Sequence, residues 1–226
     1  MNKKNDFSSF RILVTAGPTI EPIDPVRFIS NFSTGTMGYK IAFQAKAYGA
    51  KVTLVSGPVN IIPPKNIDVI SIQTAREMRD IILKKINDVD CIIMSSAVCD
   101  YRPVEFKNEK IKKKGKKISL ELTENPDILE EIGTRDGLIK AGFALETSNA
   151  VKNAYKKLKE KKLDLIVYNM VSSSVTPFGE NLTTIGIMDK HGNVKEFKNI
   201  SKDKCAVLIL DEIGELLSRG RVKREV

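Results

Sequence analysis

"RILVTAGPTIEPIDPVRFISNFSTGTMGYKIAFQAKAYGAKVTLVSG", residues 11–57, holds two short apolar runs with a helical pattern between them. The runs at 11–17 and 51–57 predict strands that are buried on both faces of a sheet. Between them, residues 37–50 predict a helix that ends near Gly49. The apolar side chains of this helix share one stripe: Met37, Ile41, Ala45 and Tyr48. Strand, helix and strand in this order predict a βαβ unit with parallel strands and a right-handed crossover.

The same alternation continues along the chain. Further strands are expected at 67–72, 91–98, 137–146 and 164–170, and further helices at 74–87, 149–163 and 202–219. Thr74 and Glu77 have the spacing of a capping box at the start of one helix. Residues 183–197 alternate around Gly192 and predict a hairpin. We therefore predict one α/β domain over residues 1–226, with a doubly wound, mostly parallel Rossmann-like sheet and helices on both faces.

The overall composition is that of a globular domain, with 42% hydrophobic and 29% charged residues in a chain of 226. No apolar stretch approaches the roughly 20 residues that span a bilayer. The first ten residues lack the apolar core of a signal peptide, so we expect a cytoplasmic protein without a membrane partner. Cys91, Cys99 and Cys205 lack metal-ligand spacing and are expected to be reduced thiols.

Positive charge is concentrated in one segment. The formal net charge is +9, and residues 107–117, "KNEKIKKKGKK", carry seven lysines against one glutamate. We predict a lysine-rich hairpin flap at about 104–122. The segment is either a solvated charge run or a mobile cationic flap beside a phosphate site. The net charge favours anionic partners, among them nucleic acid, a membrane surface and phosphorylated metabolites.

Residues 17–38 form an unusually long connection between the first strand and the first helix, and a loop of this length is typical of function or disorder. Ser33, Thr34, Gly35 and Thr36 lie just before the helix, where free backbone N–H groups favour a phosphate. The alternative is that Ser33 or Thr34 only caps the helix. No dinucleotide fingerprint is present, because Gly17 is followed by proline and the next glycine is Gly35.

Ligands of open parallel sheets bind beyond the carboxyl ends of the strands. The loops that leave these ends are expected at 17–36, 98–117, 145–149 and 169–182. At one strand end, Asp100 is either a turn residue or a ligand for a ribose hydroxyl or a metal-bound water. The single histidine, His191, is expected at a hairpin tip, so the first loop has no Ser/His or Cys/His pair and the sequence has no Cys/His zinc cluster. Catalysis by positioning and electrostatics is therefore favoured over covalent catalysis.

Six pieces of the sequence, in order, resemble the phosphopantothenate–cysteine ligase family, also called phosphopantothenoylcysteine synthetase. They are "VTAGPTIEPIDPVRFISNFSTGTMG", "VTLVSGPV", "SSAVCDYRP", "EKIKKKGKKISLELTENPDIL", "GFALET" and "KKLDLIVYNMVS". The chain departs from the family pattern at Thr34, where serine is common, and at Leu145, where alanine is common. Ser95, Ser96 and Cys99 stand where the family usually has small residues such as alanine. The length suggests the stand-alone bacterial-type ligase, without a fused flavin-dependent decarboxylase.

The resemblance implies an acid–amino-acid ligase of coenzyme A biosynthesis. The carboxylate of 4′-phosphopantothenate attacks the α-phosphate of CTP and releases pyrophosphate. The amine of L-cysteine then attacks the acyl-nucleotide, forming the amide and releasing CMP. Neither step needs a protein nucleophile, and Mg²⁺ (or Mn²⁺) uses few protein ligands when it bridges phosphates. The metal ligands are not specified by the sequence. The family is dimeric, so a homodimer is expected.

Residue roles follow from the same resemblance. Asn31, Lys110 and Arg27 match the catalytic positions, with Asn31 at the activated acyl group and Lys110 on the flap. The nucleotide-binding positions are Met94, Ser95, Ser96, Asp100, Lys110, Pro126, Asp127, Ile128, Leu129, Phe143, Lys157 and Lys161. The phosphopantothenate-binding positions are Gly17, Arg27, Ser30, Asn31, Ser33, Thr34 and Gly35. Without the resemblance, Lys157 and Lys161 would be interpreted as a solvated helix face, although they are four residues apart on one side of the helix.

Two other functions are compatible with parts of the sequence. A nicotinamide- or flavin-binding doubly wound oxidoreductase would share the fold, but the glycine fingerprint is missing. A nucleic-acid-binding module would explain the lysine-rich segment. The aromatic content is 6%, with no tryptophan and no aromatic residue in 107–117, which leaves little base stacking. We therefore expect no specific nucleic-acid partner.

Overall fold

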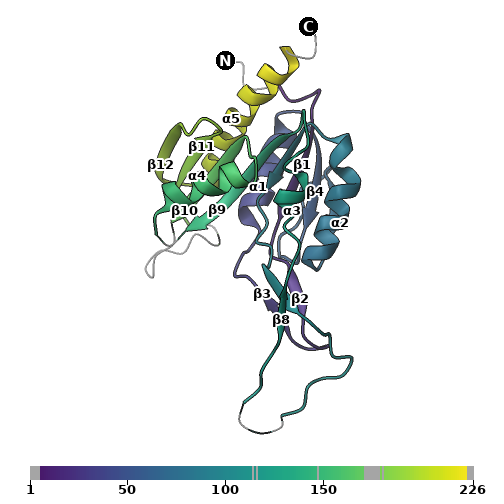
Figure 1. Ribbon diagram of the computed structural model, residues 1–226. Coiled ribbons are helices and arrows are strands. Elements are labelled where there is room, and N and C mark those ends of the chain that lie inside the picture. Colours follow the sequence, from purple (N-terminus) through teal and green to yellow (C-terminus); the bar gives the residue numbers. More distant parts are fainter. Residues whose placement is uncertain are drawn as a thin grey trace.

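The computed structural model describes residues 6–113, 115, 117–146, 148–170, 179 and 181–222. Within these residues, eight strands form one sheet (Figure 1). Their order is β12 (Val194–Ile200), β11 (Thr183–Asp189), β10 (Leu165–Met170), β9 (Ile139–Glu146), β6 (Cys91–Met94), β1 (Arg11–Ala16), β4 (Lys51–Ser56) and β5 (Asp68–Ser71). Neighbours from β10 to β5 pair in parallel, and β11 and β12 continue the sheet as an antiparallel hairpin.

Helices cover both faces of this sheet. The helices are α1 (Thr36–Ala47), α2 (Ala75–Lys85), α3 (Ile128–Ile132), α4 (Ala150–Glu160) and α5 (Lys202–Val222), with a short 3₁₀ helix at Ile86–Asp88. Ile12 and Val14 of β1 pack in a core with α1 and α5, whereas Leu13 packs on the other face with α2 and α3. Successive side chains of a strand point to opposite faces, so a strand covered on both sides is apolar throughout. The prediction of a doubly wound, mostly parallel sheet is confirmed.

Local signals at the helix ends agree with the structure. Thr74 and Glu77 form the predicted capping box at the start of α2, with Thr74 Oγ1 accepting from the Glu77 N–H at 3.2 Å. After α1, Gly49 has a φ of +98° and donates its N–H to Lys46 O at 2.9 Å. This left-handed position suits glycine and ends the helix as expected. In the part of the chain that the structure describes, no helix combines the length and hydropathy that crossing a bilayer requires.

A narrow arm projects from the body below the sheet (Figure 1). It contains the hairpin β2 (Ile20–Pro22) with β3 (Phe28–Ser30), and the antiparallel pair β7 (Tyr101–Pro103) with β8 (Leu122–Glu124). The long first connection is therefore partly a hairpin, which the sequence pattern did not reveal because three residues are too few to display a period.

The lysine-rich flap at about 104–122 is an excursion closed at its base by β7 and β8. The described residues between these strands form no strand, so the paired strands lie at the base of the flap and not in its lysine-rich tip. Like charges directly opposite each other destabilise a strand pair, which explains why the described lysine-rich residues of the flap form no strand. Lys114 and Lys116 lie outside the described residues, as do residues 171–178 and 180 of the expected loop 169–182 and residue 147 of the expected loop 145–149.

Candidate functional site

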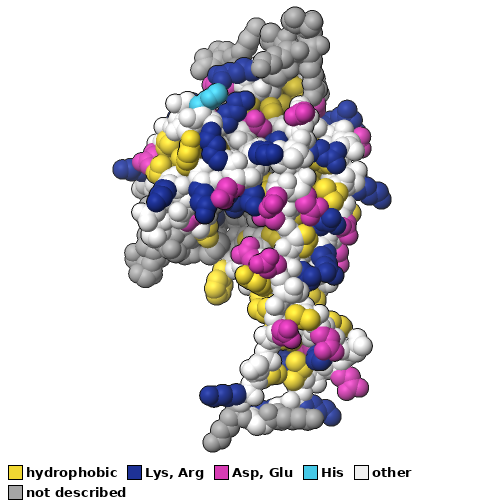
Figure 2. All heavy atoms as spheres, in the orientation of Figure 1, with side chains coloured by type: hydrophobic (Ala, Val, Ile, Leu, Met, Phe, Trp, Pro, Cys, Tyr) yellow, Lys and Arg dark blue, Asp and Glu magenta, His cyan; other side chains and the backbone are white. Residues whose placement is uncertain are grey.

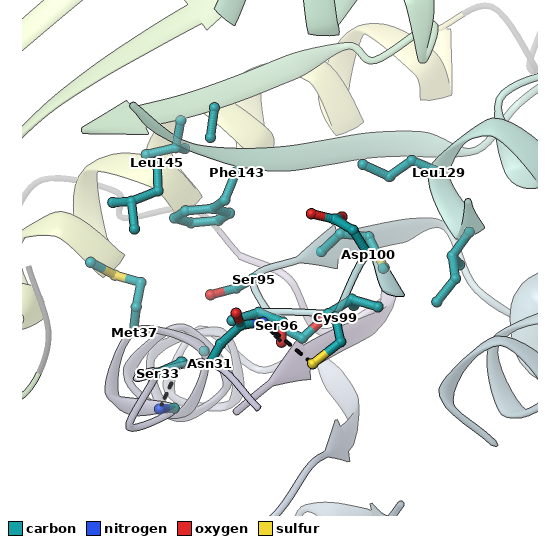
Figure 3. Close-up of a pocket in the computed structure, with 18 of the residues that line it drawn as sticks. Asn31, Ser33, Met37, Ser95, Ser96, Cys99, Asp100, Leu129, Phe143 and Leu145 are labelled. Atoms are coloured by element: carbon teal, nitrogen blue, oxygen red, sulfur yellow. Dashed lines mark hydrogen bonds between the residues drawn. The ribbon is translucent and has the colours of Figure 1, made fainter. Parts of the chain in front are cut away.

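A cavity of about 850 Å³ opens beyond the carboxyl ends of β6, β9 and β10 (Figure 3). The chain runs from β1 to β4 on one side and returns to β6 on the other side of β1, so the strand order reverses here. A reversal of this kind opens the crevice in which doubly wound proteins bind their ligands. Residues from all four predicted loops line the cavity, for example Asn31, Asp100, Leu145 and Asn169. Leu145 and Asn169, however, belong to the ends of β9 and β10, which extend into the predicted loops.

The start of α1 forms one wall of the cavity. Gly35 is its N-cap residue, with a φ of +78°, and no side chain caps the helix. Thr34 Oγ1 instead bonds Thr36 Oγ1 at 2.9 Å, and Ser33 Oγ accepts the N–H of Gly35 at 3.3 Å. The alternative that Ser33 or Thr34 caps the helix is therefore wrong. The first backbone N–H groups of α1 have no partner inside the helix and carry the positive end of its dipole.

Close packing places this helix end against the end of β1. A Cβ on Gly38 would lie 2.6 Å from Ala16 Cβ and 2.8 Å from Thr15 O, so only glycine lets α1 approach the strand this closely. Gly17 has a φ of +75°, and a Cβ there would meet Val59 Cγ1 at 2.8 Å. Both glycines act in packing and backbone geometry, and together they bring the turn before α1 to the edge of the sheet.

The loop after β6 forms the floor of the cavity. Ser96 Oγ bonds Thr15 Oγ1 at 2.8 Å, which directs this side chain into the sheet. Ser95 Oγ is buried without a hydrogen-bond partner among the described residues. Asn31 Nδ2 donates to Ala97 O at 3.0 Å and also lies 3.8 Å from Cys99 Sγ. Figure 3 shows Asn31 and Ser33 on the side of the cavity opposite Phe143 and Leu145.

Two lysines, Lys157 of α4 and Lys161 directly after this helix, reach the cavity from the side of β9. Lys157 Nζ donates to Phe143 O at 3.0 Å. Burial lowers the pKa of Lys157, although the carboxylates of Asp127, Asp100 and Glu146 oppose this shift. Its ammonium is therefore desolvated and incompletely neutralised, which favours an anionic ligand.

Lys161 has a different environment from Lys157. Its Nζ pairs with Glu130 Oε2 at 2.9 Å and with Asp127 Oδ2 at 3.0 Å. Two hydrogen bonds raise the pKa of Lys161: the larger contribution comes from Glu130 and the next from Asp127. Asp127 also caps α3, because its Oδ1 accepts the N–H of Glu130 at 3.0 Å. Lys161 therefore orders the start of α3 and already has two carboxylate partners.

Most of the predicted site residues line this one cavity. They are Asn31, Ser33, Thr34, Gly35, Met94, Ser95, Ser96, Asp100, Pro126, Asp127, Ile128, Leu129, Phe143, Lys157 and Lys161. Four others lie outside the lining: Gly17, Arg27, Ser30 and Lys110. Ser30 Oγ donates to Thr19 O at 2.8 Å, and Arg27 pairs with Asp24 in the arm. The ligands that these residues bind stay predictions.

Other lining residues were not singled out by the sequence. They include Phe32, Asn125, Glu130, Asn169, Thr183 and Lys202. Lys202 is only 5% exposed although it is the first residue of α5, a position where lysine is usually solvated. No local pattern identifies it, because its place at the cavity depends on the packing of α5 beside α1. His191 lies exposed between β11 and β12, as predicted.

Fold and cavity together define a doubly wound α/β protein with lysines and a helix N-terminus facing the crevice at its switch point. Residues 7–217 match the family described as the DNA/pantothenate metabolism flavoprotein C-terminal domain. The chain belongs to this family.

Among curated relatives, the coenzyme A biosynthesis bifunctional protein CoaBC of Bacillus subtilis is 41% identical over 207 residues, which are 91% of this chain and 51% of that protein. A protein named cysteine/cysteine sulfinic acid decarboxylase, from an unknown prokaryotic organism, is 40% identical over 92% of this chain and 58% of its own length. The chain thus spans about half the length of the curated relatives it matches.

Solved structures agree with the fold. The C-terminal domain of a CoaBC protein superposes with a TM-score of 0.82 and 36% identity, covering 96% of this chain and 100% of that chain. A Cab2 variant in complex with phosphopantothenate-cysteine has a TM-score of 0.80 at 15% identity, covering 97% and 90% of the two chains. At this identity the second likeness shows the fold alone.

Proposed function

We propose that the chain is a phosphopantothenate–cysteine ligase that joins 4′-phosphopantothenate to L-cysteine through an acyl-cytidylate, cleaving CTP to CMP and pyrophosphate. The observation that carries this proposal is the meeting of Asn31, Asp100 and Lys157 with the uncapped start of α1 in one cavity. Membership of the family and the coenzyme A biosynthesis relatives support the same function.

In this proposal the cavity binds two groups of phosphates. Backbone N–H groups at the start of α1 hold the phosphate of 4′-phosphopantothenate, a type of contact that helix N-termini provide. Lys157, with its desolvated ammonium, neutralises part of the triphosphate. Lys161 contributes less, because Asp127 and Glu130 already pair with it. Positioning both substrates in one cavity lets the carboxylate attack the α-phosphate in line.

Asn31 orients the acyl group. Its Nδ2 donates to Ala97 O, so the amide is held beside the loop after β6. An uncharged amide can donate its second N–H to an acyl oxygen without adding charge to the site. Lys110 approaches from the flap and stabilises charge on the nucleotide during the first step. The amine of cysteine then attacks the acyl carbon and CMP leaves, and this step needs no protein nucleophile.

The residues at the cavity would suit a Mg²⁺ ion that binds together with the substrate phosphates. Mg²⁺ keeps several waters and usually takes one or two carboxylates together with substrate phosphates. Asp100 lines the cavity and offers such a carboxylate, and the described residues contain no cluster of three or more metal-ligating side chains. When bound, the ion (Mg²⁺ or Mn²⁺) would neutralise negative charge on the triphosphate.

The proposal includes a homodimer in the cytoplasm. Large apolar side chains are exposed on the arm and the flap: Val26, Phe28, Tyr101, Val104, Phe106, Ile118, Leu120 and Leu122. Figure 2 shows hydrophobic side chains on the arm among charged ones. Exposed apolar surface of this kind is typical of an interface, and a second copy of the chain is the proposed partner. Sedimentation velocity should give twice the monomer mass, and Phe28→Glu should lower it.

The experiment that tests the function measures pyrophosphate release with Mg²⁺ and 4′-phosphopantothenate, with CTP or ATP, and with or without cysteine. We expect release with CTP that requires phosphopantothenate, and amide product only after cysteine is added. Release with neither nucleotide would reject the ligase. A flavin or nicotinamide absorbance in the purified protein, or tight sequence-specific binding to nucleic acid, would favour the other functions considered above.

A further inference from the structure

Residues 107–111 of the flap are hydrogen-bonded to the turn between β2 and β3. The N–H of Lys107 donates to Ile23 O at 3.0 Å, and the N–H of Ile111 donates to Asp24 Oδ2 at 3.0 Å. Arg27 Nη2 donates to Ile111 O at 2.8 Å. The two Ile111 contacts join a tight turn to a segment more than 80 residues later, directly beside Lys110.

Asp24 is the centre of this arrangement. Its side chain is fully buried, in an arm that is otherwise largely exposed. Its Oδ1 accepts the N–H groups of Val26 and Arg27 at 2.9 Å each, and its Oδ2 accepts from Arg27 Nε at 3.0 Å and pairs with Nη2. A buried carboxylate is tolerated only when its oxygens are satisfied in this way.

The guanidinium of Arg27 holds the pKa of Asp24 well below its usual range. Burial of the carboxyl opposes this shift, and the N–H groups of Ile111, Val26 and Arg27 reinforce it. The carboxylate of Asp24 therefore stays ionised throughout the neutral range, and the N–H of Ile111 has a charged acceptor at these pH values.

We propose that Asp24 and Arg27 form a clamp that positions Lys110, so that Asp24 is a positioning residue for the first half-reaction. The catalytic consequence of the clamp rests on the proposed function, whereas the clamp itself rests only on the contacts described above. β7 and β8 already close the base of the flap. The clamp acts farther out, at Ile111, where it adds nothing to the eight-stranded sheet and fixes the segment that carries Lys110.

The test compares Asp24→Asn with Asp80→Asn. Asparagine retains the size of the side chain, but its amide NH₂ is a donor and would face the donors of Ile111 and Arg27. Asp80 also pairs with an arginine, Arg79, but lies far from the flap on α2, so it controls for the loss of one ion pair. The readouts are amide hydrogen exchange at Ile111 and Lys107, and kcat and KM for pyrophosphate release.

In Asp24→Asn we expect exchange at Ile111 to rise at least tenfold, while Lys107, which donates to a backbone carbonyl, changes less than threefold. The kcat should fall about tenfold with KM for CTP within twofold, because positioning acts on the transition state. Asp80→Asn should match the wild type in all readouts. Unchanged Ile111 exchange, or raised exchange with unchanged kcat, would overturn the proposal.

Arg27→Lys provides a second variant if Asp24→Asn folds poorly by circular dichroism. Lysine retains the charge but has one nitrogen where the guanidinium uses two, Nε and Nη2, to hold Asp24 Oδ2 and Ile111 O. Asp24 is then held less firmly, so Ile111 exchange should again rise. Absence of pyrophosphate release by the wild type would reject the proposed function. The clamp would then be judged on exchange alone, with unchanged Ile111 protection in both variants counting against it.

Discussion

The sheet and the arm differ in what holds them together. β1 and β6 are buried along nearly their whole length, and apolar side chains cover both faces of the sheet. The paired strands of the arm have three residues each and expose large apolar side chains. Its strongest internal contacts are polar, and they centre on Asp24. Burial therefore stabilises the body, whereas hydrogen bonds and ion pairs order the arm.

This difference indicates which part of the molecule holds its residues in fixed positions and which part is expected to move. The cavity walls come mainly from the ends of body strands and helices, so packing fixes their positions. The flap belongs to the arm, which buries little apolar surface and is expected to open locally at lower free energy than the body. A change in the body should alter global stability, and a change in the arm should alter function with little effect on global stability.

The largest effect is expected from the arm. Lys110→Gln should lower the rate of pyrophosphate release about 100-fold, the cost of removing one donor to a transition-state charge. The melting temperature should stay within about 1 °C, because the flap adds little to the sheet. Lys113→Gln, on the same flap, is the matched control. Equal losses in both variants would show that only the summed charge of the flap matters.

The next effect concerns a body residue that faces the cavity. Lys157→Met should weaken CTP binding about 30-fold, in the range for a lost hydrogen bond to a charged group. It should also raise the melting temperature of the ligand-free protein by about 2–4 °C, because a desolvated ammonium is removed. Lys156→Met, on the exposed side of α4, is the control and should change neither quantity.

The sign of the pH dependence follows from the lowered pKa of Lys157. Between its folded and unfolded pKa values the unfolded chain binds more protons, so wild-type stability rises with pH relative to Lys157→Met. The advantage of the variant is therefore greatest at neutral pH and disappears as pH rises through the ordinary lysine pKa. An advantage that is the same at pH 7 and pH 10.5 would contradict burial as its cause.

A third prediction tests packing in the body directly. Gly38→Ala should lower the free energy of unfolding by about 2 kcal/mol, because the new methyl group meets Ala16 and Thr15. Gly115→Ala, at a flap position where nothing lies within 4 Å, is the comparison in the arm. Its positive φ strains the flap locally and should leave the melting curve unchanged. Urea unfolding measures the free energy of unfolding of both variants. A similar decrease in the two would contradict the difference between body and arm.

The smallest effect is expected at Ser95, whose buried hydroxyl lacks a partner among the described residues. Ser95→Ala should leave stability unchanged or slightly higher, because no hydrogen bond is lost in the free protein. If a ligand supplies the partner, the same change should weaken CTP binding about fivefold, as for one neutral hydrogen bond. Calorimetric titration of both proteins checks this, and equal affinities would exclude Ser95 from the ligand contacts.

The elements that the sequence predicted are those whose pattern repeats over several residues. The sequence revealed β1 and β4 because a strand that is buried on both faces requires an unbroken apolar run. It revealed α1 because a helix that packs on a sheet requires a stripe of apolar side chains. The hairpin of β2 and β3 and the short α3 were not visible, because three to five residues cannot display a period. Asp100 was singled out by its place at the end of a strand, but only the family resemblance chose between its two interpretations. Asn31 received its role from the resemblance and not from a local pattern.

The sequence by itself determined the class of fold, the loops that carry the cavity and the concentration of charge on the flap, since each depends on local order along the chain. Only the tertiary structure decided that Lys157 is desolvated while Lys161 is paired, and that Lys202 reaches the cavity. Only the tertiary structure also decided that Asp24 binds Ile111 of the flap, a residue more than 80 positions later in the chain. Burial and partnership arise from segments distant in sequence, so no local pattern encodes them.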